Sequence, residues 1–393
     1  MIIGLVGKPS SGKSTFFKAA TLAEVAIAPY PFTTIEKNEG VGYVKKECVE
    51  KEFKVKCKPK FGYCINGTRF IPVKLIDVAG LVPGAHKGKG RGNAFLDDLS
   101  EADILIHVLD ASGKTDAEGN VTEGYNVIEE VKFLQDEIDF WIRGILAKNW
   151  EKFARKVHTE KKKLSDELAK QVSGLKIKEE SVIRVLNELN LNESILKWDE
   201  NDLLAFARNL RKEAKPIIIA ANKMDVGSSE ENLKKLKEDF PDLPIIACSS
   251  EIELLLREAA KKNLIEYIPG ASEFEMKKEL NEQQKKALEF VKKYLLKHKN
   301  TGIQQCLNNA VFDILGMRVV YPVENENKLI DKDGNILPDA FLLPRKSDAL
   351  NLAEKVHTDV AKNYHSAIDA RTKKRLPRDY ELRDGDVIKI MTH

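Results

Sequence analysis

The chain has 393 residues, and at roughly 100–200 residues per domain this length predicts about two to four folding units. Hydrophobic residues make up 42% and charged residues 32%, which excludes a wholly disordered, collagen-like or fibrous chain. Because 64 Lys+Arg face 61 Asp+Glu, the formal net charge is only +3. Net charge therefore gives no argument for nucleic-acid binding, and any basic surface must be local.

The cysteines and the apolar runs bear on the cellular compartment. The five cysteines form an odd set without a Cys-x-x-Cys pair, which argues against a disulfide framework and favours a reducing cytosol. Cys57 and Cys64 could flank a hairpin, and paired metal ligands there are the less favoured interpretation. No apolar run reaches the ~20 residues that a membrane-spanning helix needs, and the first residues are not a basic leader. We expect a cytoplasmic protein without a membrane partner.

Short apolar runs in the first two thirds of the chain predict buried strands. Helix-like segments separate these runs, and the first such segment is Ser14–Thr21. This alternation is typical of an α/β fold with a largely parallel sheet. The strand candidates are Ile2–Val6, Val73–Ile76, Ile104–Leu109, Ile217–Ala221 and Ile245–Ala247.

The interval between Ile128 and Lys212 breaks this alternation. It is helical in pattern and without proline, which favours an antiparallel helical hairpin, or coiled coil, inserted into the sheet domain. Within it, Lys148–Lys178 is rich in basic residues: ten Lys/Arg against four Asp/Glu. This run is either an RNA or ribosome contact, through residues such as Lys152 and Lys156, or a solvated helical face.

The C-terminal part has two sections. A helical region, Glu273–Leu315, precedes a small α+β module in which strand runs Arg318–Val323 and Asp386–Met391 bracket a helix pattern at Asp348–Tyr364. We therefore predict four units. They are a sheet domain (1–128 plus 212–270), a helical insert (129–211), a helical linker packed on the sheet domain (271–316) and a C-terminal domain (317–393).

The first strand candidate is followed by a phosphate-loop motif. Gly7-Lys-Pro-Ser-Ser-Gly-Lys-Ser14 matches Gly-x4-Gly-Lys-Ser/Thr between a strand and a helix. Backbone N–H groups of such a loop surround phosphate oxygens, while Lys13 should reach the β- and γ-phosphates and Ser14 should ligate Mg²⁺. The alternative is a glycine turn before a helix. The nucleotide-binding residues expected here are Gly7, Ser10, Ser11, Gly12, Lys13, Ser14 and Thr15.

Asp77-Val-Ala-Gly80 follows the next apolar strand. An Asp at that strand tip can hold Mg²⁺ through water, and the Gly80 N–H can sense a γ-phosphate. The segment 84–92, with four glycines in nine residues, suits a loop that the γ-phosphate orders and hydrolysis releases.

Two later segments address the base. Asn222-Lys-Met-Asp225 follows a buried strand, where the Asp225 carboxylate can accept N1–H and N2–H₂ of guanine, a pair that adenine does not offer. Lys223 would pack its stem over the base, and Asn222 would tie loops together. A weaker signal is Cys248-Ser249-Ser250, whose backbone N–H groups could meet guanine O6.

Together these motifs resemble the Obg-related P-loop GTPases, and most closely the YchF (Obg-like ATPase) subfamily. The resemblance rests on the phosphate loop and on four further segments: Tyr30–Ile35, Asp77–Val82, Gly92–Phe95 and Asn222–Asp225. The tail, with Val356-His-Thr-Asp359 and Leu382–Ile388, is similar to a TGS domain, a β-grasp module. The resemblance implies a P-loop G domain with a helical insert and a TGS domain.

The resemblance also implies residue roles. Thr34, or its neighbour Thr33, corresponds to the switch threonine that ligates Mg²⁺ and contacts the γ-phosphate. Leu81 stands where many GTPases carry a water-orienting glutamine, so catalysis should use another arrangement. The motifs and the resemblance together give Lys13, Thr34 and Gly80 as catalytic residues and Ser14, Thr34 and Asp77 as metal ligands.

The intact Asp225 bears on the choice between GTP and ATP. YchF relatives often carry Glu at this position and prefer ATP, so Asp225 favours guanine. Related potassium-activated GTPases carry Asn where this chain has Ser10, which leaves potassium dependence open. We predict an Mg²⁺-dependent switch protein that binds GTP and hydrolyses it to GDP, in contact with ribosomes or RNA through the insert and the TGS domain. The alternatives are an ATPase of the same fold, or an RNA- or ribosome-binding module that uses nucleotide as a latch.

Overall fold

The structure is a computed structural model that describes residues 1–22, 38–78, 98–191 and 195–393. Thr33, Thr34, Gly80, Leu81 and the glycine-rich segment 84–92 lie outside these ranges, so the roles expected of them from the sequence stay predictions. Within the described ranges no helix combines the length and the hydrophobicity needed to cross a membrane.

A seven-stranded sheet forms the centre of the molecule, and its strand order is β2-β4-β1-β5-β6-β7, with β3 paired to β4. Five strands are parallel, as the buried apolar runs predict, and β2 and β3 run antiparallel to β4. The strands are β1 (Ile2–Val6), β2 (Glu39–Glu47), β3 (Tyr63–Ile65), β4 (Thr68–Asp77), β5 (Ile104–Asp110), β6 (Ile217–Asn222) and β7 (Ile245–Ala247).

Helices cover both faces of this sheet. On one side α1 (Lys13–Thr21) packs against α10 (Ser250–Lys261) and against α12 (Ile303–Asn308), which continues as a π-helical turn at Asn309–Ile314. On the other side lie α9 (Ser229–Asp239) and the first helix of the insert. The remaining elements here are α2 (Glu50–Phe53), the short hairpin β8 (Ile265–Glu266) and β9 (Glu275–Met276), and α11 (Glu282–His298).

The expectation of one helical region over Glu273–Leu315 is therefore too simple. The segment begins with the strand β9, and the chain turns between α11 and α12. Lys299 at φ +68° and Gly302 at φ +84° adopt the left-handed conformation that ends one helix and starts the next.

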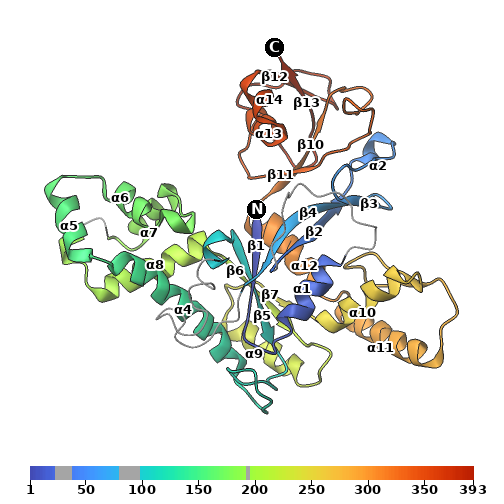
Figure 1. Cartoon of the computed structure of the whole chain (residues 1–393), viewed down its shortest axis with the longest axis horizontal. Helices are drawn as coiled ribbons and strands as arrows, with labels where there is room; N and C mark the ends of the chain where they lie inside the picture. Colours follow the sequence, from blue (N-terminus) through green and yellow to red (C-terminus); the bar gives the residue numbers. More distant parts are fainter. Residues whose placement is uncertain (23–37, 79–97, 192–194) are drawn as a thin grey trace.

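Within its described residues, the helical insert contains two long α-helices and three short ones (Figure 1). The long helices α4 and α8 pack against each other, as a hairpin requires, but the segment between them folds into further helices instead of a tight turn. The hairpin prediction is wrong in this respect. A shared apolar core explains the difference, because Trp150 stacks on Trp198 with ring centroids 5.5 Å apart. The helices are α4 (Val127–Ala147), α5 (Trp150–Thr159), α6 (Leu164–Gln171), α7 (Glu179–Glu188) and α8 (Glu200–Ala214).

The C-terminal domain is a four-stranded mixed sheet of order β11-β10-β13-β12, with β10 and β13 parallel at its centre. The single helix predicted over Asp348–Tyr364 is two helices. His357 interrupts it with extended backbone, and its Nδ1 accepts a hydrogen bond from the Asp359 amide at 3.1 Å, which caps the second helix. The elements are β10 (Arg318–Val323), β11 (Phe341–Leu343), α13 (Ala349–Val356), α14 (Thr358–Lys362), β12 (Tyr364–Asp369) and β13 (Val387–Thr392).

The C-terminal domain rests on the end of the sheet near α2 (Figure 1). Tyr321 and Val387 share one hydrophobic cluster with Val44 of β2. At the rim, Lys46 pairs with Asp384 at 2.8 Å, and Arg371 pairs with Glu52 through Nε at 2.5 Å. The Arg371 guanidinium is thus paired within the chain.

Candidate nucleotide-binding site

The sequence motifs converge at one edge of the sheet. Parallel strands β1, β4, β5, β6 and β7 end there, so the residues at the end of each strand and just after it come together. These residues are the loop beginning at Gly7, Asp77, Asp110, the Asn222–Asp225 segment and Ser249–Ser250.

Lack of space for a side chain explains both glycines of the phosphate loop. A Cβ on Gly7 would lie 2.4 Å from the Val108 carbonyl oxygen, and one on Gly12 would lie 2.3 Å from Asn222 Nδ2. Gly12 also has φ +90°, which disfavours any other residue. The loop can therefore keep this path beside β5 and β6 only with glycine at these positions.

Lys13 and Asp77, predicted from separate motifs, form an ion pair. The Lys13 ammonium also donates to the Val78 carbonyl at 2.8 Å. Ser14 is exposed at the start of α1, and Thr15 is half-buried beside it. A hydroxyl and a carboxylate are hard oxygen donors of the kind that Mg²⁺ takes, so the residues at this edge fit a magnesium ion.

Asn222 links the phosphate loop to the segment after β7. Its side-chain nitrogen donates to the Ser11 carbonyl at 2.9 Å. Its side-chain oxygen accepts from the Ser250 amide at 3.0 Å and from the Ser250 hydroxyl at 2.9 Å. Asn222 is 2% exposed, so these bonds are shielded from water and fix the spacing between the two segments.

Asp225 is held by Ser249, whose hydroxyl donates to the carboxylate at 2.7 Å. Ser249 also caps α10 by accepting a hydrogen bond from the Ile252 amide at 3.3 Å. The hydroxyl of Ser249 thus fixes the orientation of Asp225 relative to a helix start. From the sequence, we predicted only a backbone role for this segment.

Lys223 contacts the phosphate loop and a residue that sequence reasoning missed. Its ammonium donates to the Ser10 carbonyl at 2.7 Å and pairs with Asp110 at 2.8 Å. Burial would raise the pKa of Asp110, but hydrogen bonds from Lys223, Ser112 and Thr115 outweigh it and hold this pKa below its usual value. The signal in the sequence was an Asp that ends a strand and is followed two residues later by Ser.

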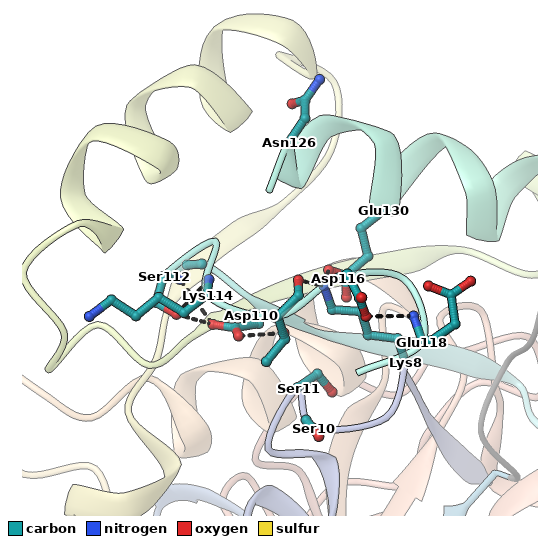
Figure 2. A network of polar contacts seen from close by, with 12 residues as sticks. Lys8, Ser10, Ser11, Asp110, Ser112, Lys114, Asp116, Glu118, Asn126 and Glu130 are labelled. Atoms are coloured by element: carbon teal, nitrogen blue, oxygen red, sulfur yellow. Dashed lines mark hydrogen bonds and ion pairs between the residues drawn. The ribbon is translucent and has the colours of Figure 1, made fainter. Parts of the chain in front are cut away.

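Lys8 is the second missed residue, and it anchors the phosphate loop to the helical insert (Figure 2). Its ammonium pairs with Glu130 of α4 at 2.9 Å and donates to the Thr115 carbonyl at 2.6 Å. It also lies 4.0 Å from the centroid of the Tyr125 ring. Both charged side chains are only 3% exposed, so this is a buried ion pair. The motif leaves this position free, and spacing alone could not pair it with Glu130.

Comparison with known proteins agrees with this geometry. Three segments match family descriptions: residues 2–141 match "50S ribosome-binding GTPase", residues 220–325 match "Obg-like GTPase YGR210-like, G4 motif-containing domain", and residues 332–392 match "TGS domain". An uncharacterized GTP-binding protein, MJ1332 of Methanocaldococcus jannaschii, is 51% identical over 100% of this chain and 99% of its own. The chain belongs to the Obg-like family of P-loop GTP-binding proteins.

Two further proteins are similar to this Obg-like chain. The crystal structure of a GTP-binding protein from Pyrococcus horikoshii superposes with a TM-score of 0.80 at 41% identity, covering 100% of both chains. The ribosome-binding ATPase YchF of Mycoplasma genitalium is 33% identical over 56% of this chain and 55% of its own. The predicted family, its P-loop GTPase domain and its TGS domain are thus confirmed.

Proposed function

We propose that this Obg-like protein is an Mg²⁺-dependent GTPase that switches between GTP and GDP states in the cytoplasm. One observation carries the proposal. The phosphate loop, Asp77 and the Asn222–Asp225 segment meet at one edge of the sheet, joined by the Lys13–Asp77 and Asn222–Ser11 contacts. Each contributes a part that a P-loop nucleoside triphosphatase needs.

The residues at this edge are proposed to have different roles. The backbone of the loop and Lys13 bind the phosphates, and Ser14 and Asp77 hold Mg²⁺, which neutralises charge on the β- and γ-phosphate oxygens when bound. When a triphosphate binds, Lys13 must leave Asp77 to reach the phosphates. The Asp77 carboxylate is then free to help hold Mg²⁺. Thr34 and Gly80 are proposed to contact the γ-phosphate, so that hydrolysis releases their segments.

We predict that Asp225→Asn reduces the preference for GTP over ATP by roughly 100-fold. The carboxylate can accept two N–H bonds from guanine, and a hydrogen bond to a charged group contributes about 1.5–3 kcal/mol. Ser249 holds the Asp225 carboxylate at 2.7 Å, and an Asn in the same place can offer the base only one acceptor. Parallel titration of wild type and variant with fluorescent GTP and ATP analogues measures the preference.

The control for Asp225→Asn is Asp239→Asn, which makes the same change at the exposed C-terminal end of α9. It should leave both affinities unchanged. Equal affinity of the wild-type protein for GTP and ATP would contradict guanine recognition and favour the ATPase alternative.

A second candidate function is ribosome or RNA contact through the insert. Several basic side chains there are already paired: Lys162 with Glu160 at 2.8 Å, and Lys163 with Glu179 at 2.9 Å. Three others are exposed and have no ion pair within the described part of the chain: Lys152, Lys156 and Lys161. The name of the YchF relative, a ribosome-binding ATPase, supports a ribosomal partner for these lysines.

Reversing Lys152 and Lys156 to Glu should weaken ribosome or RNA binding by roughly 10- to 100-fold and flatten its dependence on salt, because each phosphate contact releases a counterion. Sedimentation at several salt concentrations, with GTP, with GDP and without nucleotide, measures both effects. The matched control reverses Lys234 and Lys237 on α9, which are equally exposed. If both pairs of reversals act alike, the basic run is a solvated face.

A further inference from the structure

Three cysteines and a glutamate gather far from the nucleotide site, beside the joint with the C-terminal domain. Cys48 and Glu50 follow β2, Cys57 lies in the loop before β3, and Cys64 lies in β3. Their ligand atoms all lie within 4.8 Å of one another. Cys57 and Cys64 do not flank a hairpin turn, so the predicted hairpin was wrong. Their side chains nevertheless lie close to each other.

Two of the six distances between these ligand atoms match a tetrahedral metal site. With metal–sulfur bonds of about 2.3 Å and metal–oxygen bonds of about 2.0 Å, neighbouring sulfurs should lie about 3.8 Å apart and a sulfur and an oxygen about 3.5 Å apart. Cys48 and Cys57 Sγ are 3.8 Å apart, and Cys64 Sγ lies 3.4 Å from Glu50 Oε1. The second oxygen of Glu50 accepts from the Cys57 amide at 2.8 Å, which fixes the carboxylate.

The positive charge of Arg69 lies beside this cluster and would be balanced by a negatively charged metal site. It lies opposite Cys64 in the β3–β4 ladder and is 0% exposed. Its guanidinium donates to the carbonyls of Leu337 and Pro338 at 3.0 and 2.7 Å, but its Nε has no hydrogen-bond partner and no ion pair is formed by Arg69 among the residues the structure describes. A buried cation without an ion pair is costly. Three thiolates and a carboxylate around a divalent ion leave the cluster negative, which would compensate Arg69.

We propose that Cys48, Glu50, Cys57 and Cys64 bind a structural Zn²⁺ ion. Three thiolates favour a thiophilic cation over Mg²⁺, and four protein ligands leave no open position for catalysis. The alternative is a Cys48–Cys57 disulfide, which would leave the Cys64 thiol without a metal and would remove the thiolate charge of Cys48 and Cys57 beside Arg69.

The position of the site suggests what the metal stabilises. The loop that carries Cys57 forms backbone hydrogen bonds to the C-terminal domain, from Lys58 N to the Ile336 carbonyl at 2.8 Å and from Lys60 N to the Pro338 carbonyl at 2.9 Å. Arg69 donates to the same segment. A zinc ion that ties this loop to β2 and β3 therefore holds the surface on which the C-terminal domain rests.

The test is the metal content of the full chain, purified under reducing conditions and analysed by mass spectrometry of metals. We expect about one zinc per chain, and a cobalt-substituted protein with thiolate-to-cobalt charge-transfer absorption. Cys64→Ser and Glu50→Gln should each weaken zinc retention against a chelator at least about tenfold. Both residues are half-buried, so these variants should fold even if Cys48→Ser does not.

Cys306→Ala is the matched control, because Cys306 is also buried beside a second cysteine, with its Sγ 3.5 Å from Cys248 Sγ. Within the described residues that pair lies in no group of ligands suited to a metal, so the variant should keep its zinc. Absence of zinc together with failure of the reduced protein to bind added zinc would overturn the proposal. So would a Cys48–Cys57 disulfide in the native protein, or equal zinc loss in Cys306→Ala.

Discussion

Lys13→Ala should lower the affinity for Mg²⁺·GTP by at least about 100-fold, since charge-assisted hydrogen bonds contribute about 1.5–3 kcal/mol each and the ammonium is proposed to reach two phosphates. In the structure this ammonium is held between Asp77 and the Val78 carbonyl, at the sheet edge where the phosphate loop begins. Equilibrium titration with a fluorescent GTP analogue measures the loss.

The fold should tolerate this substitution. Lys13 and Asp77 side chains are 13% and 24% exposed, so water can reach the carboxylate that loses its partner. Lys18→Ala is the control on the same helix, because Lys18 pairs with Glu258 at 2.9 Å on the exposed side of α1. Unchanged GTP affinity in Lys13→Ala, with wild-type affinity in Lys18→Ala, would rule out the phosphate loop as the binding site.

Apolar runs and short motifs in the sequence predicted those parts of the site that lie within a single motif. The strand Ile2–Val6 and the glycines of the loop follow from apolar runs and from the room that a tight turn needs. Asn222 was expected to tie loops together, and its hydrogen bonds to Ser11 and Ser250 do so, although its part in nucleotide binding stays a prediction.

Contacts between distant segments were beyond sequence reasoning. Asp110 and Lys223 are 113 positions apart, and nothing in either segment specifies the pairing. The cysteine cluster shows the same limit, because the spacing of Cys48, Cys57 and Cys64 matches no common zinc motif. Only the pairing of both β2 and β3 with β4 brings these segments together. In the insert, the apolar pattern gave helices but not their ends, which depend on a shared core around Trp198.

Glu130→Gln should destabilise the protein by about 3–5 kcal/mol, the usual effect of leaving one member of a buried ion pair without its partner. Lys8 would keep its charge in a pocket where its side chain is 3% exposed. Its remaining partners are the Thr115 carbonyl and the Tyr125 ring, and neither is anionic. At about 2–4 °C per kcal/mol for a domain of this size, the thermal midpoint should fall by roughly 6–20 °C.

The neighbouring Glu129 provides a matched control. Its side chain is 60% exposed and 3.8 Å from Lys132, so Glu129→Gln should cost less than about 1 kcal/mol. The double variant Lys8→Met with Glu130→Gln removes the buried charge altogether and should regain part of the lost stability. Because Lys8 follows Gly7 in the phosphate loop, Glu130→Gln should also weaken GTP binding, whereas Glu129→Gln should not. Equal thermal midpoints for the two Gln variants would contradict a buried pair that joins the loop to α4.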